Sequence, residues 1–573
     1  MRWMGWLSIA GVIALGAASV GCDSDETGTG GAGNGGSAGA GVGGGGTGGV
    51  APAGEIAGPV TRYDYVFDTE ALTADTVVTV DVQSPGGDCV ALESAIEVGA
   101  VTWNGEPAVS ATAADGVLQA CGAAVFPGEL AVGASAVVPK KKYYGLDVGY
   151  SRKKDMAGGD FSYLLSWVEG CDYFGPCDDD PGTVAEMHFE VKHPAGLPVL
   201  CAGARTEGET STRCDIEGTL APTYSAVAWA SDPLWEKKSF ANINGVEWVF
   251  YEVPGGKLAS SLDPAMMSQF FGWMVARFGP FPYGKELRFA GGPTAWLGFE
   301  HPANILLREK LDALQTDYVD TMAHVTMHEV THQWAGDRTT IASAGDFVWK
   351  EAMAEYLPYV FEDETLGGEV AAATRAYWDG ISLQAKHFPR PTDEPLPHVS
   401  QFYGDVYGPG PMVLFLQLEA LIGRAAVLDG IEAFLGPAGG RSVAELAAAL
   451  SKAAGVDLGP YFDAWVFGAG VPEWPTLKVE TQSVGGFEEV TVTQVNPSGK
   501  LYGCVVEVEV QGATSSVLAK IDFGVAPTSA SASAVVTLNE PVVATVLDPQ
   551  HKLIARNAAV PLKAPTPRPV WIF

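Results

Sequence analysis

Two histidines four residues apart flank a glutamate in the segment His328-Glu329-Val330-Thr331-His332. On a helix, side chains four positions apart lie on one face, so both imidazoles can reach a single tetrahedral metal ion. Glu329 lies beside them and can hold a water molecule against that ion. Eighteen residues separate His332 from Glu351, whose carboxylate would complete a set of two histidines and one glutamate with an open fourth position. Such a set is typical of catalytic zinc sites rather than closed structural ones.

Two further residues lie one helical turn from these ligands. Glu355 follows Glu351 by four positions and either supports the site from behind or faces water. His324 precedes His328 by four positions, and we expect a core or surface role for it rather than metal binding.

Helices must hold these side chains in place. The sequence predicts one helix around His328 and His332 and another around Glu351. One is expected over 317–334 and a second over 346–357, where Pro358 would end it. Asp263-Pro264 is a typical helix start, and Gly279 a typical end. A helix over 411–422 and a capping box at Ser442–Glu445 complete a mainly helical middle region.

The flanking regions show the alternation of apolar and polar residues that is typical of strands. Examples are 78–82 and 187–191 before the helices, and 490–493 and 506–510 after them. We therefore predict a multidomain α+β fold. It comprises an N-terminal β-rich domain at 57–252, a catalytic domain at 253–474 and a C-terminal β-sandwich at 475–573.

The first residues are typical of an exported protein. Arg2 precedes an apolar run from Trp6 to Val20, which is a secretory signal pattern over 1–21 and too short for a membrane span. Gly21-Cys22 resembles the lipobox of bacterial lipoproteins, so we predict a lipid anchor on Cys22. The alternative is ordinary secretion, with a secreted or periplasmic product. The Gly-rich residues 22–56, which begin at the cysteine predicted to be lipidated, are expected to form a flexible linker.

The charge and the cysteine positions bear on the binding partners, the disulfides and the presence of a structural zinc site. The 573 residues have a formal net charge of −34, which argues against nucleic acid as a partner. Export permits disulfides, and the sequence-local pairs are Cys89–Cys121, Cys171–Cys177 and Cys201–Cys214, leaving Cys504 alone. Zinc binding by cysteines is not expected, because no two have the two-residue spacing of a structural site.

The residues around the metal motif resemble those of a known family. His332-Gln333-Trp334-Ala335-Gly336-Asp337 and the stretch 346–356 are similar to the aminopeptidase N family of zinc metallopeptidases, the gluzincins. The resemblance implies a thermolysin-like catalytic domain that binds one Zn²⁺ per chain. The implied ligands are His328, His332 and Glu351, with Glu329 as general base. Trp349-Lys350 and Ala352 differ from the residues that the family usually has at these positions of the motif.

Two more stretches extend the resemblance. Residues 296–302 resemble the family's GxMEN element, which implies that Glu300 binds the α-amino group of the substrate; the alternative is that Glu300 is only a salt-bridge partner. Leu297 and Phe299 replace its glycine and methionine, and Trp167 stands roughly where many relatives have a second, glutamine contact.

Residues 407–414 resemble the family's YxKGxxVL stretch, which implies that Tyr407 donates to the oxyanion. Pro409 replaces the lysine, and Tyr403 is the rival candidate for this role.

The function that the resemblance implies is an exported zinc aminopeptidase acting on oligopeptides through metal-activated water. Two alternatives stay open. A zinc endopeptidase of the same fold is one, because Leu297, Trp167 and Pro409 alter the substrate region. A catalytically silent peptide-binding surface lipoprotein is the other, although the intact Glu329 argues against it.

Overall fold

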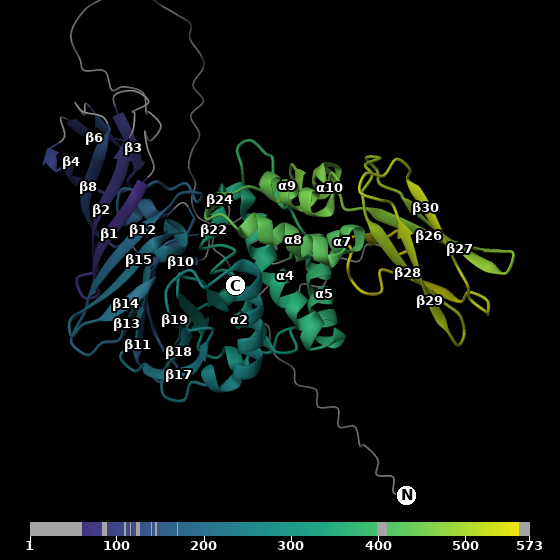
Figure 1. Cartoon of the computed structure of the whole chain (residues 1–573), viewed down its shortest axis with the longest axis horizontal. Coiled ribbons are helices and arrows are strands. Elements are labelled where there is room, and N and C mark those ends of the chain that lie inside the picture. The colour runs from purple at the N-terminus through teal and green to yellow at the C-terminus, as the bar shows by residue number, and fades with distance from the viewer. Residues whose placement is uncertain are drawn as a thin grey trace, which may run out of the picture. The chain divides into compact units, whose positions relative to one another are not determined.

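The computed structural model describes residues 60–82, 89–107, 110–114, 116–121, 127–138, 140–143, 146–168, 170–397 and 410–560. Strands dominate this part of the chain up to residue 252, helices lie between 264 and 465, and strands return from 476 (Figure 1). The order confirms the predicted multidomain organisation, with a β-rich N-terminal region, a helical middle and C-terminal strands.

The N-terminal region consists of strands and one short helix. They are β1 (Val60–Asp68), β2 (Thr73–Val82), β3 (Cys89–Glu93), β4 (Val98–Trp103), β5 (Glu106–Pro107), β6 (Ser110–Ala114), β7 (Val117–Cys121), β8 (Gly128–Val137), β9 (Lys140–Tyr143), β10 (Leu146–Lys154), β11 (Asp160–Leu165), β12 (Val184–Lys192), β13 (Val199–Cys201), β14 (Ala204–Glu207), β15 (Ser211–Pro222), α1 (Thr223–Ala226) and β16 (Ala228–Ser231). The strand orders are β14-β15-β12-β1-β2-β8-β4-β5, β13-β16-β11-β10-β9 and β3-β7-β6. In β12, Met187, Phe189 and Val191 are buried, as their alternation predicted.

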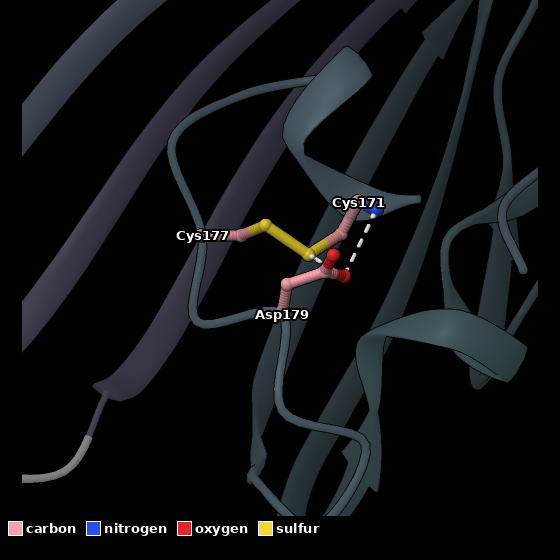
Figure 2. A group of neighbouring side chains, drawn as sticks. All are labelled: Cys171, Cys177 and Asp179. Carbon is pink, nitrogen blue, oxygen red and sulfur yellow. Dashed lines mark hydrogen bonds between the residues drawn. A yellow bond between two sulfur atoms is a disulfide. The ribbon is translucent and has the colours of Figure 1, made fainter. Parts of the chain in front are cut away.

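Two of the predicted disulfides are confirmed, Cys171–Cys177 and Cys201–Cys214, and Cys504 is a free, buried thiol. Antiparallel pairing of β3 and β7 places Cys89 opposite Cys121. Their side chains lie outside the described part, so that disulfide stays a prediction. The Asp179 carboxylate points at the first disulfide and accepts from the backbone N–H of Cys171 at 3.4 Å (Figure 2). This trio is not a metal site, because its sulfurs are bonded to each other and cannot act as thiolate ligands.

The sheet of the middle region crosses the boundary predicted at residue 252. Its strands are β17 (Glu236–Ile243), β18 (Val246–Glu252), β19 (Glu286–Gly292), β20 (Gly298–Phe299) and β21 (Asn304–Arg308), in the order β17-β18-β19-β21-β20. Strands β18 and β19 pair in parallel and are buried almost throughout. Helix α2 (Pro264–Phe278) connects them and covers one face, where Phe271 contacts Trp248 edge-on at 5.4 Å between ring centres.

The other elements of the middle region are mostly helices. They are α3 (Thr321–Thr331), β22 (Thr339–Ile341), α4 (Phe347–Thr365), α5 (Gly368–Ser382), β23 (Arg390–Pro391), α7 (Met412–Ile422), α8 (Arg424–Leu435), β24 (Gly439–Arg441), α9 (Val443–Ala454), α10 (Gly459–Trp465) and β25 (Phe467–Gly468). The predicted ends of α2 are confirmed, with the Asp263 carboxylate accepting from Ala265 N and Gly279 after the last residue. The capping box at Ser442 and Glu445 is confirmed as well. Within the described residues, no helix is both long and apolar enough to cross a bilayer.

The prediction that Pro358 ends the second motif helix is wrong, because α4 continues to Thr365 with Pro358 inside it. A proline in a helix interior removes one backbone hydrogen bond and costs about 3 kcal/mol. Residues on both sides of Pro358 are buried, including Leu357, Tyr359 and Val360. Burial of each such side chain stabilises by about 1.5–3 kcal/mol, so tertiary packing outweighs the local preference.

The C-terminal region contains β26 (Thr476–Val484), β27 (Phe487–Gln494), β28 (Val505–Gln511), β29 (Ser516–Asp522), β30 (Ser531–Val536), β31 (Ala544–Leu547) and β32 (Arg556–Asn557). One sheet has the order β30-β27-β26-β32 and the other β29-β28-β31. The predicted alternation is present in β27, where Val490 and Val492 are buried between partly exposed neighbours.

Candidate metal centre

Helix α3 holds both histidines of the motif in the protein interior. It begins at Asp320, whose carboxylate accepts from the backbone N–H of Ala323 at 3.0 Å. All of its residues are buried, and His332 directly follows its last turn. The Nε2 atoms of His328 and His332 lie 3.2 Å apart, so the four-residue spacing brings them together as predicted.

Glu351 on the neighbouring helix α4 completes a triangle of ligand atoms. Its Oε2 lies 3.3 Å from His328 Nε2 and 3.5 Å from His332 Nε2. A tetrahedral zinc ion with ligand distances of about 2.0–2.1 Å separates its ligand atoms by about 3.3–3.4 Å. The three edges of the triangle therefore match one face of a zinc tetrahedron, and the donor set fits this metal.

Hydrogen bonds fix both imidazoles with Nε2 turned toward the triangle. His332 Nδ1 donates to the Ala335 carbonyl at 3.0 Å, and His328 Nδ1 donates to Glu355 Oε2 at 3.2 Å. In the neutral form of each imidazole one nitrogen donates and the other accepts, so with both rings neutral both Nε2 atoms present lone pairs. Two such lone pairs 3.2 Å apart favour a cation between them.

The charges around the triangle also favour a metal ion. Burial opposes ionisation of Glu351, but the cation of Lys350 and the histidines hold the pKa of its carboxyl well below the usual range. Burial lowers the pKa of His332, with a contribution from the Lys350 charge, which keeps this ligand neutral. The carboxylates of Glu351 and Glu355 outweigh burial and raise the pKa of His328 to about 9. The same carboxylates that favour a proton at this ring favour a metal ion beside it.

Glu355 contacts the ligand histidine His328 and does not face water, so of the two roles open for it in the sequence it has the supporting one. It is fully buried, and besides His328 its carboxylate accepts from Tyr318 Oη at 2.8 Å and from Trp378 Nε1 at 2.5 Å. It also accepts from His324 Nε2 at 2.9 Å. Outer carboxylates of this kind orient a ligating histidine and raise its basicity.

Both ring nitrogens of His324 are used in hydrogen bonds, so neither is available as a metal ligand. Its Nδ1 donates to Glu362 Oε1 at 2.8 Å while its Nε2 donates to Glu355. Burial acts to lower its pKa, but the two carboxylates outweigh it and raise the pKa to about 10. His324 is thus a buried imidazolium that keeps Glu355 ionised.

Glu355→Gln is expected to lower the affinity for zinc about 10–100-fold, because His328 loses its anionic partner. The matched control is Glu362→Gln, which removes the other carboxylate of His324 without touching His328. We expect that control to keep the wild-type zinc affinity, measured by competition with a chelator of known affinity. Equal losses in the two variants would contradict the assigned role of Glu355.

Glu329 lies on α3 with its carboxylate against the backbone of β20. A Cβ atom on Gly298 would come within 2.2 Å of Glu329 Oε1, so only glycine leaves room for this carboxylate. Oε1 is buried and has no hydrogen-bond partner among the described residues. Burial and the nearby carboxylates of Glu300 and Glu351 raise the pKa of Glu329 well above its usual range. A carboxyl group with a raised pKa is suited to taking up a proton and returning it.

Glu300 directly follows β20 and reaches the same place. Single ligand atoms of Glu300, Glu329 and His332 lie within 4.8 Å of one another. The Lys350 ammonium forms ion pairs with Glu300 Oε1 at 2.6 Å and with Glu351 Oε1 at 2.8 Å. Burial opposes ionisation of Glu300, but this contact outweighs it and lowers the pKa of the carboxyl.

The structure therefore brings together His328, His332, Glu351, Glu329 and Glu300. Tyr407 and its rival Tyr403 lie outside the described residues, so the predicted oxyanion contact stays a prediction. The ion pair of Lys350 with Glu300 was missed by sequence reasoning. The available signal was a lysine directly before the metal ligand in a stretch that is otherwise rich in apolar residues.

Comparison with known proteins agrees with this geometry. A family model described as the peptidase family M1 domain matches residues 297–465, which include all five residues of the centre. "Probable aminopeptidase 1" of Sulfurisphaera tokodaii is 26% identical over 240 residues, which cover 40% of this chain and 30% of that protein. "Aminopeptidase N" of Streptomyces lividans is 24% identical over 352 residues, 56% of this chain and 39% of that protein. The chain thus matches only about a third of the length of these curated relatives.

Among solved structures, the chain is similar to Legionella pneumophila aminopeptidase A, crystallised in complex with aspartic acid. The TM-score is 0.69 at 14% sequence identity, and the match covers 88% of this chain and 60% of that one. This likeness establishes the shared fold. The family model also covers the buried triangle of two histidines and a glutamate, so residues 297–465 resemble the peptidase family M1 domain.

Proposed function

We propose that this protein is a zinc-dependent aminopeptidase that hydrolyses the first peptide bond of oligopeptides. The observation that carries the proposal is the ligand triangle of His328, His332 and Glu351 with Glu329 and Glu300 directly beside it. In this proposal the middle region is a thermolysin-like catalytic domain and the C-terminal strands form a β-sandwich.

His328, His332 and Glu351 would hold one Zn²⁺ per chain. When bound, zinc supplies Lewis-acid chemistry, polarising the scissile carbonyl and making water acidic enough to react at neutral pH. Glu329 takes the proton of the attacking water and later passes it to the leaving amine. Its buried position directly beside the ligand triangle supports this role, because a general base must be within reach of the attacking water.

Glu300 would receive the α-ammonium group of the substrate. Its second carboxylate oxygen can accept this group while Oε1 contacts Lys350. Anchoring the N-terminus this close to the metal ligands would leave the first peptide bond within reach, which makes the enzyme an exopeptidase. Tyr407 is proposed as the donor to the oxyanion on the basis of sequence alone.

An endopeptidase of the same fold is the second candidate. The observation that favours it is the ion pair of Lys350 with Glu300, which compensates the charge meant for a substrate amine.

Metal analysis joined to an assay tests the proposal. The purified protein is expected to contain about one zinc per chain and to cleave aminoacyl p-nitroanilides. Activity should disappear with a strong chelator and return on adding Zn²⁺. A protein that binds stoichiometric zinc but cleaves neither anilides nor internal peptide bonds would instead be a silent peptide binder.

We further propose that the enzyme acts outside the cytoplasm, anchored through a lipid on Cys22. The signal pattern over 1–21 supports export, and so do the Cys171–Cys177 and Cys201–Cys214 disulfides, which are typical of oxidising compartments. Cys22→Ser should move the protein from the membrane fraction to the soluble fraction. Equal distribution of wild type and variant would reject the anchor.

A further inference from the structure

The amine-binding region of the centre already contains a cation of the protein's own. Lys350 is completely buried, and its ammonium lies between Glu300 Oε1 at 2.6 Å and Glu351 Oε1 at 2.8 Å. The Phe347 ring covers the ammonium, with its centre 5.5 Å away. Lys350 therefore links the carboxylate proposed to bind the substrate to a ligand of the metal.

The backbone is shaped to admit this lysine. A Cβ atom on Gly336 would come within 3.0 Å of both Lys350 Cε and His332 Nδ1. The glycine thus allows the lysine side chain to pass close behind a metal ligand. Since a buried ammonium is costly without partners, the two carboxylates also fix the side chain in this one position.

Trp167, which stands roughly where many relatives have a glutamine contact, offers little to a second ammonium. Trp167 is buried with its ring edge-on to Phe299 at 5.3 Å and to Phe347 at 6.0 Å between ring centres. An indole has an N–H donor and no acceptor, so Trp167 cannot accept a hydrogen bond from an ammonium group. Of Trp167 and Glu300, only Glu300 can accept from a substrate amine, and Lys350 already compensates its charge.

We propose that Lys350 is a specificity-determining residue that weakens recognition of the substrate's α-amino group by holding Glu300. The inference rests on the proposed peptidase function. Two cations on one buried carboxylate repel each other, so the amine gains less from Glu300 than it would from an unpaired carboxylate. Substrates with an α-amino group should accordingly be preferred over those without one by a smaller factor than an unpaired carboxylate would give.

The test compares an aminoacyl p-nitroanilide that the wild type cleaves with its des-amino analogue, which lacks the amine and adds no bulk. A hydrogen bond to a charged group changes affinity about 10–100-fold, so we expect the wild-type kcat/KM ratio of the pair to be below about tenfold. In Lys350→Gln and Lys350→Met the ratio should rise at least about tenfold, mainly through a lower KM for the amine.

Zinc content, measured on the same preparations, should stay at the wild-type value. An unchanged ratio in variants that retain zinc would overturn the inference. If neither variant folds or retains zinc, the wild-type ratio decides, and a value above about tenfold overturns the inference. A wild type that cleaves neither member of any such pair would reject the peptidase function itself.

Discussion

Glu329→Gln is expected to lower kcat by about 10²–10⁴-fold while leaving the zinc content unchanged. The amide keeps the size of the side chain but cannot take up the proton of the attacking water. The three metal ligands are other residues, so their triangle should remain intact. Steady-state kinetics on an aminoacyl p-nitroanilide, with metal analysis of the same sample, measures both effects.

A matched control for this substitution is Glu369→Gln. Glu369 is exposed on α5, and the same chemical change there should leave kcat at the wild-type value. If Glu329→Gln retains full activity with zinc bound, Glu329 is not the general base.

Gly298→Ala should lower kcat/KM about 100-fold, although residue 298 itself has no reactive group. The new Cβ would lie 2.2 Å from Glu329 Oε1 and 2.5 Å from its Cδ, so the carboxylate has to move away from its position. The distances among the ligand atoms of His328, His332 and Glu351 do not involve this contact, so zinc binding should persist. Kinetics and metal analysis again separate the two effects.

Gly292→Ala is the control for a general packing defect. A Cβ on Gly292 would come within 2.5 Å of the Phe161 ring, in the same sheet but away from Glu329. This variant should unfold at a lower temperature and retain the wild-type kcat. A similar loss of kcat in both variants would mean that strain in the sheet, rather than displacement of Glu329, causes the effect.

Local patterns in the sequence predicted the features that depend on short separations. The pairing of His328 with His332 needs only one helical turn, and the confirmed disulfides join cysteines 6 and 13 residues apart. The cap at Asp263 is local in the same way. In each case the geometry of a few neighbouring residues fixes the contact.

Features that depend on packing between distant parts of the chain could not be predicted from local sequence patterns. Lys350 and Glu300 are separated by fifty positions and belong to different elements, so their ion pair arises only when α4 packs near the end of β20. Pro358 appeared to end a helix because its local cost is visible in the sequence, whereas the burial that offsets this cost is not. His324 is a similar case. Its hydrogen-bond partners are Glu355 and Glu362, which lie on another helix more than thirty residues further along the chain.

The five-stranded sheet whose edge strand β20 directly precedes Glu300 limits how the protein can be divided. Two of its strands, β17 and β18, precede residue 253, and Arg288 of β19 donates from Nη2 to the carbonyls of Cys201 and Gly203 in the N-terminal region. A truncated chain starting at residue 253 would expose the edge of β19 and remove both carbonyl acceptors of Arg288 Nη2, while Nη1 would keep its contact with Glu286 at 3.4 Å. The region that contains the candidate metal centre therefore cannot be separated at residue 253. Exchange of domains between relatives should succeed only where the break falls before β17 and the new N-terminal region supplies acceptors for Arg288.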